Sequence, residues 1–153
     1  MDLMFLGCSN LHSIDISSFN TINVETMEQM FVECYSLISL NVSNFNVQKV
    51  LNMDNMFYGC SFLTSLDLFE LDNKYIKNLD YFFYNDVSLT YLDLSKFNVK
   101  YIESMVGMFS ECNSLIYINF TNFNAQNVKD MSSMFSGCYS LKSVDLSSFN
   151  FQY

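Results

Sequence analysis

Six aspartate and asparagine side chains recur at one fixed spacing and are the first candidates for chemistry in this sequence. Each lies 26 residues after the one before: Asp15, Asn41, Asp67, Asp93, Asn119 and Asp145. Carboxylate and amide oxygens suit Ca²⁺, but a calcium site needs several oxygens that converge on one ion. A straight row does not converge. We therefore expect a solvated polar ladder or an acidic stripe that contacts a partner, and we keep calcium as a third interpretation.

The five cysteines follow the same spacing. They share one column of the sequence, in which Asp86 takes the remaining place: Cys8, Cys34, Cys60, Cys112 and Cys138. Because free cysteine is among the residues most often buried, we predict a row of small core side chains. Disulfides between neighbouring copies are the alternative, although an odd number in one column does not resemble a disulfide framework. Zinc is disfavoured because the sequence has no paired C-x-x-C.

His12 is the one histidine in the sequence and the most obvious general base. No nucleophile recurs beside it, and it occurs in a single copy of the pattern, so we predict a solvated loop residue. No copy brings together a nucleophile, a base and an oxyanion donor. We therefore predict that the protein is not an enzyme and that it uses no cofactor and no metal.

These residues are carried by a 26-residue repeat. The pair Met30-Phe31 recurs at every step of 26, once as Phe82-Phe83, with no insertion or deletion. Self-similarity at a fixed period is the sequence signature of stacked-repeat architectures, in which each unit buries its apolar side against its neighbours. The period therefore decides the fold class before any single element is assigned.

Each copy is predicted to contain a short helix. Met27, Met30 and Cys34 are spaced by three and four residues, as on one face of a helix of about two turns. Acidic residues follow in the first turn, where the helix dipole favours them: Glu28, Asp54 and Asp80. The helix should end where glycine or asparagine tolerates a left-handed conformation, at Gly7, Gly59, Asn85 and Gly137. Glu33 and Glu111 break that rule in two copies.

A strand follows the helix, because Leu40 and Val42 alternate with polar residues. We predict one domain over residues 1–153, an α/β repeat solenoid similar to leucine-rich repeats. It would consist of six stacked strand–loop–short helix units with a parallel sheet on one face. The aspartate and asparagine row would stand on the outer face of that sheet. Residues 69–87 match the pattern least, but they keep its length.

The outer face also carries aromatic residues. Tyr91 and Tyr117 flank the polar row where other copies have serine, and Phe69 takes another outward place that serine usually fills. Exposed aromatic side chains beside polar groups are enriched at binding hot spots. We predict a ligand-binding strand face made of these three aromatic residues and the polar row, although chance sequence drift would explain the aromatic residues equally well.

Charge narrows the choice of partner. The formal net charge is −9, and the seven basic residues are all lysine. Nucleic acids and anionic membrane surfaces select clustered cations, so both are disfavoured. No apolar stretch approaches the roughly 18 residues of a membrane span, so we expect no direct membrane insertion. A protein or a glycan is the expected ligand.

Two phrases resemble a known family. Residues 56–68 read MFYGCSFLTSLDL, and residues 134–150 read MFSGCYSLKSVDLSSFN. They look like the BspA-type leucine-rich repeat surface proteins, and the resemblance covers the whole chain. It implies extracellular, anchored repeats that adhere to host or matrix proteins, hence a cell-surface or secreted location. The alternative is a cytoplasmic scaffold or a structural spacer without a ligand of its own.

The two ends of the chain fall within the repeat. Met1 aligns with Met27, and neither end shows a polar segment that would cap a terminal core. Solenoids need such caps. We therefore expect either part of a longer array or end-to-end self-association through the uncapped repeats.

Overall fold

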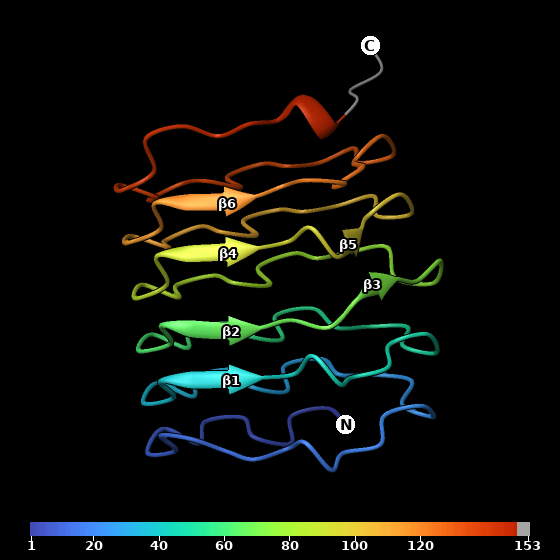
Figure 1. The fold of residues 1–153 in the computed structure, drawn as a ribbon, viewed down its shortest axis with the longest axis vertical. Helices are drawn as coiled ribbons and strands as arrows, with labels where there is room; N and C mark the ends of the chain where they lie inside the picture. Colours follow the sequence, from blue (N-terminus) through green and yellow to red (C-terminus); the bar gives the residue numbers. More distant parts are fainter. Residues whose placement is uncertain (150–153) are drawn as a thin grey trace.

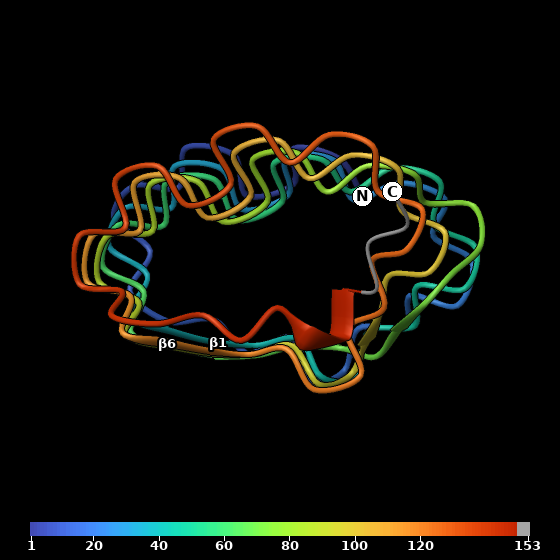
Figure 2. The same ribbon diagram turned by 90° about the horizontal axis from the view of Figure 1, so that it is seen from above.

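The computed structural model describes residues 1–149, so the last four residues of the predicted 1–153 domain lie outside the described part. The chain winds as a stack of coils (Figure 1). Seen from above, successive coils trace nearly the same flattened loop (Figure 2). The elements, in chain order, are β1 (Ser39–Asn41), β2 (Ser65–Asp67), β3 (Leu71–Asp72), β4 (Tyr91–Asp93), β5 (Phe97–Asn98), β6 (Tyr117–Asn119) and the 3₁₀ helix η1 (Ser147–Phe149).

All strand pairs are parallel and in the register that the repeat demands. Ser39 lies opposite Ser65, and Tyr91 lies opposite Tyr117, so paired residues differ by one period of 26. The predicted continuous sheet is wrong in extent. The described residues form three separate two-stranded sheets, β1–β2, β3–β5 and β4–β6, and β2 does not pair with β4. The physical reason is that the chain changes path after β2.

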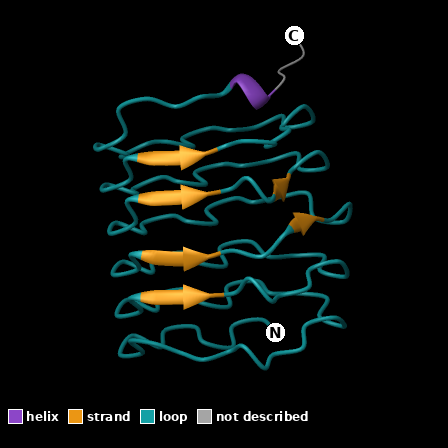
Figure 3. Cartoon of the chain, viewed as in Figure 1, coloured by secondary structure: helices purple, strands orange, loops and turns teal. Residues whose placement is uncertain are grey.

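The predicted helix in each copy is wrong. Between residues 27 and 34 the chain makes consecutive turns, and the only helix among residues 1–149 is η1 (Figure 3). The N–H groups of Gln29, Phe31 and Glu33 donate to carbonyls of the next coil, at N···O distances of 3.0, 2.9 and 2.8 Å. An α-helix would direct these donors to carbonyls four residues back in the same segment. Here, they hold one coil to the next.

Left-handed residues explain the turns. Two positions of the repeat, four residues apart, have φ between 54° and 76° in every copy: Leu3, Gln29, Asn55, Tyr81, Gly107 and Ser133, then Gly7, Glu33, Gly59, Asn85, Glu111 and Gly137. A left-handed residue interrupts a right-handed helix. The conformation predicted at the glycine and asparagine positions is therefore confirmed, but it shapes a turn rather than ending a helix. Glu33 and Glu111 adopt it as well.

An aromatic column runs through the core. Six phenylalanine rings stack with centroids 5.3 to 5.8 Å apart and planes within 11° of parallel: Phe5, Phe31, Phe57, Phe83, Phe109 and Phe135. The methionines beside them in the inner coils, such as Met30 and Met56, are fully buried. Offset stacking at this distance is a favourable aromatic geometry. Each coil therefore covers the core of the previous one, as the repeat predicts.

The cysteine column lies beside the phenylalanine column. Cys34, Cys60 and Cys112 are buried, Cys8 and Cys138 are half-buried, and all five are free thiols. The Sγ atom of Cys60 donates to the carbonyl of Phe31 at 3.2 Å, and Cys112 does the same to Phe83 at 3.0 Å. The predicted row of small buried side chains is confirmed for the inner three. The thiol additionally satisfies a carbonyl of the preceding coil.

Asp86 occupies the cysteine place in one coil and is fully buried. Its Oδ1 accepts the Cys60 backbone N–H at 2.7 Å, whereas its Oδ2 is buried without a hydrogen-bond partner among the described residues. Burial raises the pKa of this carboxyl well above its ordinary value, and the Cys60 hydrogen bond opposes that rise only in part. A charge at this position is therefore costly to the fold.

We expect Asp86→Cys to stabilise the protein in a pH-dependent manner. The folded-state pKa of Asp86 is raised, so the wild-type carboxyl is tolerated below its unfolded pKa of about 3.9 and costs stability as the pH rises above it. The substitution also removes a buried, unpaired oxygen, which costs about 1–3 kcal/mol. Urea unfolding under reducing conditions should show a gain of that order near pH 7 and a smaller gain toward pH 4.

The control for this substitution is Asp67→Asn, which alters an exposed carboxylate and should show no such trend. Equal stability of wild type and Asp86→Cys at pH 7 would contradict the structural account of Asp86.

Candidate interaction face

The aspartate and asparagine row lies along the strand face, and most of its members are bonded to their own backbone. The side-chain Oδ1 accepts the N–H of the residue two positions later at 2.9 to 3.1 Å in five copies: Asp15, Asn41, Asp93, Asn119 and Asp145. This is an Asx turn, which closes the chain after a strand. The row is therefore a set of turn caps as well as a polar surface. The recurring pattern Asp/Asn-x-Ser/Thr was the sequence signal for it.

The same hydrogen bonds keep the carboxylates ionised. Hydrogen bonds from Ser95 lower the pKa of Asp93, and bonds from Ser17 and Ser147 do so for Asp15 and Asp145. The Asn119 amide donates to the Asp93 carboxylate at 3.0 Å across the β4–β6 pair. An amide between acids replaces repulsion with a hydrogen bond. The result is a fixed line of negative charge.

Phe69 does not lie on this face, so the prediction of an outward Phe69 is wrong. Its side chain is fully buried and stacks on Phe97 with ring centroids 5.7 Å apart. The equivalent positions carry serine or threonine, whose hydroxyl or N–H supports the Asx turn. Phenylalanine has the same backbone N–H, so the difference lies in its ring, whose burial is favourable. The chain therefore takes another path, and the Leu71 N–H donates to the Lys96 carbonyl in the next coil.

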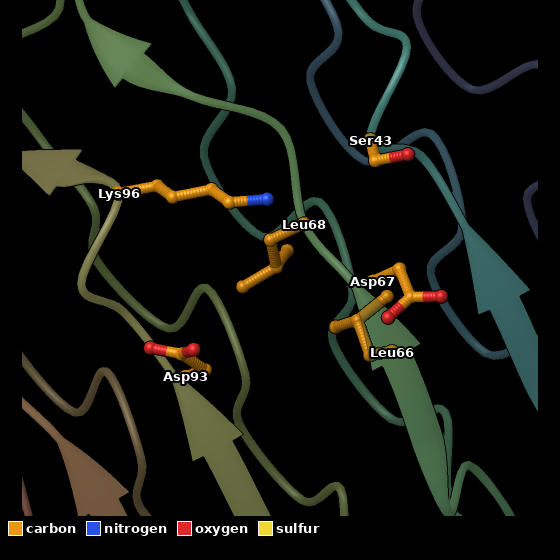
Figure 4. Close-up of a pocket in the computed structure, with 6 residues that line it drawn as sticks. All are labelled: Ser43, Leu66, Asp67, Leu68, Asp93 and Lys96. Atoms are coloured by element: carbon orange, nitrogen blue, oxygen red, sulfur yellow. The ribbon is translucent and has the colours of Figure 1, made fainter.

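This change of path interrupts the strand pairing between β2 and β4 and leaves a hollow there (Figure 4). The hollow has a volume of about 290 Å³ and is lined by Ser43, Leu66, Asp67, Leu68, Asp93 and Lys96. Figure 4 shows the Lys96 amine and the two carboxylates arranged around the Leu68 side chain. Lys96 makes no ion pair within 4 Å among residues 1–149. The hollow thus offers both signs of charge beside an apolar wall.

Tyr91 and Tyr117 lie side by side on neighbouring strands. Their ring centroids are 5.7 Å apart, their planes differ by 13°, and each side chain is 51% exposed. They begin β4 and β6, whereas Asp93 and Asn119 end the same strands. The structure therefore brings four of the predicted site residues onto one pair of strands. Their role as a ligand site stays a prediction.

Glu28, Asp54 and Asp80, which were expected in the first turn of a helix, lie in or beside tight turns instead. Without a helix there is no helix dipole at Glu28, Asp54 and Asp80, so that explanation is wrong. Burial, and then the nearby charges of Asp80 and Glu28, raise the pKa of Asp54 to about 6. The Tyr58 and Tyr84 rings stack on the same turns at 4.7 Å. The sequence pattern did not predict this second aromatic and acidic surface, because a helix was expected over those residues.

The described residues offer recognition chemistry. His12 is exposed and its Nδ1 lies 2.7 Å from the Asn10 carbonyl, within its own loop. No group of three histidine, cysteine, aspartate or glutamate side chains in residues 1–149 could hold a metal ion. Among those residues, no helix has the length and apolarity that a bilayer crossing requires. Aromatic stacking, hydrogen bonding and charge are what this face can provide.

Comparison with known proteins agrees with the repeat. A family profile described as "Mycoplasma protein of unknown function, DUF285" matches residues 1–88 and again residues 61–153. The chain is similar to the crystal structure of a leucine-rich repeat protein from Bacteroides ovatus, with 23% identity and a TM-score of 0.56. That alignment covers 92% of this chain and 32% of the Bacteroides chain, so this chain spans about a third of that protein.

A second solved structure is the leucine-rich repeat protein of T. pallidum. It shares 20% identity with a TM-score of 0.49, over 74% of this chain and 48% of that one. No curated protein sequence matches the chain. The Bacteroides likeness shows the leucine-rich repeat type of fold and, at this identity, nothing about ligands.

We expect Asp93→Ala to destabilise the fold and Asp67→Ala to leave it unchanged. Asp93 accepts the Ser95 N–H and the Asn119 amide through its carboxylate, whereas no N–H in residues 1–149 donates to the Asp67 carboxylate. Loss of the Asx bond should cost about 1 kcal/mol. The pKa of Asp93 is lowered, so this contribution is present above the unfolded pKa and is lost as the pH falls through the folded one. Urea unfolding at pH 7 compares the two variants, and an equal loss in both would contradict the assignment.

Proposed function

The chain belongs to the DUF285 family, and we propose that it is a non-enzymatic recognition module that binds a protein or glycan through its strand face. In this proposal the chain forms about six 26-residue repeats of the BspA type, displayed on the cell surface, and adheres to a host or matrix ligand. The repeat type and the surface location rest on the sequence resemblance. The binding face rests on the geometry.

The single observation that supports this face is the exposed, stacked tyrosine pair of Tyr91 and Tyr117. Two flat rings, each half exposed, present a large amphipathic surface with little side-chain entropy to lose. They stand on paired strands, so their spacing is set before a ligand arrives. Such preorganisation reduces the cost of binding.

The residues around the tyrosine pair restrict the chemistry of the ligand. Asp93 and Asn119 provide acceptors and a donor at the other end of the same strands, and Lys96 adds a cation at the hollow. An aromatic platform beside hydrogen-bonding groups suits a sugar face or a tyrosine-rich protein loop equally well. The net charge of −9 opposes a strongly anionic ligand.

We expect Tyr91→Ala combined with Tyr117→Ala to weaken capture by about tenfold or more, as for residues at the centre of a hot spot. The measurement is binding of the purified chain to immobilised collagen and fibronectin and to a glycan array, with folding checked by circular dichroism. The control is Tyr75→Ala with Tyr101→Ala, another exposed pair of tyrosines. If the Tyr91/Tyr117 double variant captured as much ligand as the Tyr75/Tyr101 control, or if the wild type captured none, the result would favour a spacer or scaffold without a ligand.

Surface display requires a separate test on intact source cells. We expect brief protease treatment of living cells to release peptides of this chain, because an exterior repeat module is accessible to the enzyme. Cells lysed before treatment provide the control for detection. Peptides that appear only after lysis would refute the cell-surface location and favour the cytoplasmic scaffold.

A further inference from the structure

The hollow between β2 and β4 contains a backbone donor that is paired at the neighbouring coil boundaries. The Val42 N–H donates to the Asp67 carbonyl at 2.9 Å, and the equivalent Leu94 N–H donates to a carbonyl of its next coil at 3.0 Å. Between them, the Leu68 N–H donates to no acceptor among residues 1–149, so the Asp93 carbonyl lacks the donor that the repeat would supply. Both residues line the hollow. Because Leu68 is only 6% exposed, its N–H favours an occupant that accepts a hydrogen bond.

Two charged side chains at the hollow also lack partners. Lys96 makes no ion pair within 4 Å among residues 1–149, and no N–H in that part of the chain donates to the Asp67 carboxylate. Asp67 has no Asx turn because the chain changes its path at Phe69. Figure 4 shows the Lys96 amine and the Asp67 carboxylate on different sides of the Leu68 side chain. A cation and an anion thus border the same hollow without neutralising each other.

A ligand that complements these groups carries an ammonium and a carboxylate close together. Its carboxylate would accept hydrogen bonds from the Lys96 amine and the Leu68 N–H. Its ammonium would donate to the Asp67 carboxylate and the Asp93 carbonyl. Hydrogen bonds in which both groups are charged are about twice as strong as neutral ones. A purely anionic ligand would be repelled by the two aspartates, and a purely cationic ligand by the lysine.

Size and polarity limit the ligand further. The hollow has a volume of about 290 Å³, which suits a small molecule rather than a protein segment with several side chains. Leu66 and Leu68 provide its apolar lining. An α-amino acid in its zwitterionic form has the required pair of charges on one carbon atom, and an apolar side chain could contact the two leucines.

We propose that the hollow between β2 and β4 binds a free α-amino acid with an apolar side chain, such as leucine, through both its ammonium and its carboxylate. At the neighbouring boundaries, β1–β2 and β4–β6 are paired, so the equivalent backbone groups are used within the protein. The hollow lies beside Asp93, at the opposite end of β4 from Tyr91. The inference therefore goes beyond the proposed function and does not rest on it.

The first test compares three ligands on the wild-type protein. L-Leucine has both charges, leucinamide lacks the carboxylate, and isocaproate lacks the ammonium. Each is titrated to about 50 mM, which covers weak, millimolar dissociation constants, and binding is followed by the backbone amide signals in ¹H–¹⁵N NMR spectra. Leucine should give saturable shifts at Leu68 and Lys96. Each analogue should bind at least about tenfold more weakly, because it loses charge-assisted hydrogen bonds.

The second test changes the protein. Lys96→Met and Asp67→Asn should each weaken leucine binding at least about tenfold, since each removes one of the two charges that the ligand contacts. The control is Lys142→Met, which removes an exposed lysine from another coil and should bind leucine as the wild type does. Tyr91→Ala combined with Tyr117→Ala should also keep leucine binding.

The proposal is overturned if the wild type shows no saturable shift with leucine, a result that does not depend on any variant. It is also overturned if leucinamide or isocaproate binds as tightly as leucine, or if the folded Lys96→Met protein keeps the wild-type affinity. Thermal unfolding of each variant confirms that it is folded. None of these outcomes affects ligand capture at Tyr91 and Tyr117, so the two proposals fail separately.

Discussion

Backbone N–H groups on the turn side of each coil find their acceptors 25 residues further along the chain, and this spacing determines the register of the other contacts. Buried backbone donors must be paired, so a coil that shifted by one residue would leave several of them unsatisfied. Once Phe31 donates to Met56, the Phe31 and Phe57 rings stack 5.8 Å apart, and the Cys60 thiol reaches the Phe31 carbonyl. The repeat length of 26 without insertions is the sequence form of the same constraint. Any insertion would move every later column out of its stack.

The period and the core columns were predictable, and the helix was not, for one physical reason. Apolar residues at steps of three and four point to one side of a helix, but they also point to one side of a chain of tight turns. What separates the two is backbone conformation. Gln29 and Glu33 are left-handed, although neither residue type announces it, because the intercoil hydrogen bonds of the whole stack outweigh the local preference of a single residue. Gly7 and Gly59 indicated in the sequence a left-handed conformation that every copy adopts at this position.

The strand face shows how one side chain alters the surface. In five copies a serine or threonine follows the aspartate or asparagine by two residues and closes an Asx turn. At Phe69 the aromatic ring goes into the core instead, β2 loses its pairing with β4, and the hollow around Asp67 and Lys96 appears. The sequence marked Phe69 as unusual but not its direction, because burial depends on whether Phe97 of the next coil provides a ring to pack on. The turn-side hydrogen bonds continue without a break past this point, so the hollow does not divide the stack.

The same constraint bears on the proposed binding face. The tyrosine pair stands on β4 and β6, whose paired residues lie one period of 26 apart, so the register of the stack also sets the 5.7 Å between the Tyr91 and Tyr117 rings. Asp93 and Asn119, at the other end of the same strands, are held by that pairing and by their Asx turns. A face whose spacing is fixed by the backbone loses little conformational freedom when a ligand binds. Binding at this face would therefore depend on the backbone register as much as on the two rings themselves.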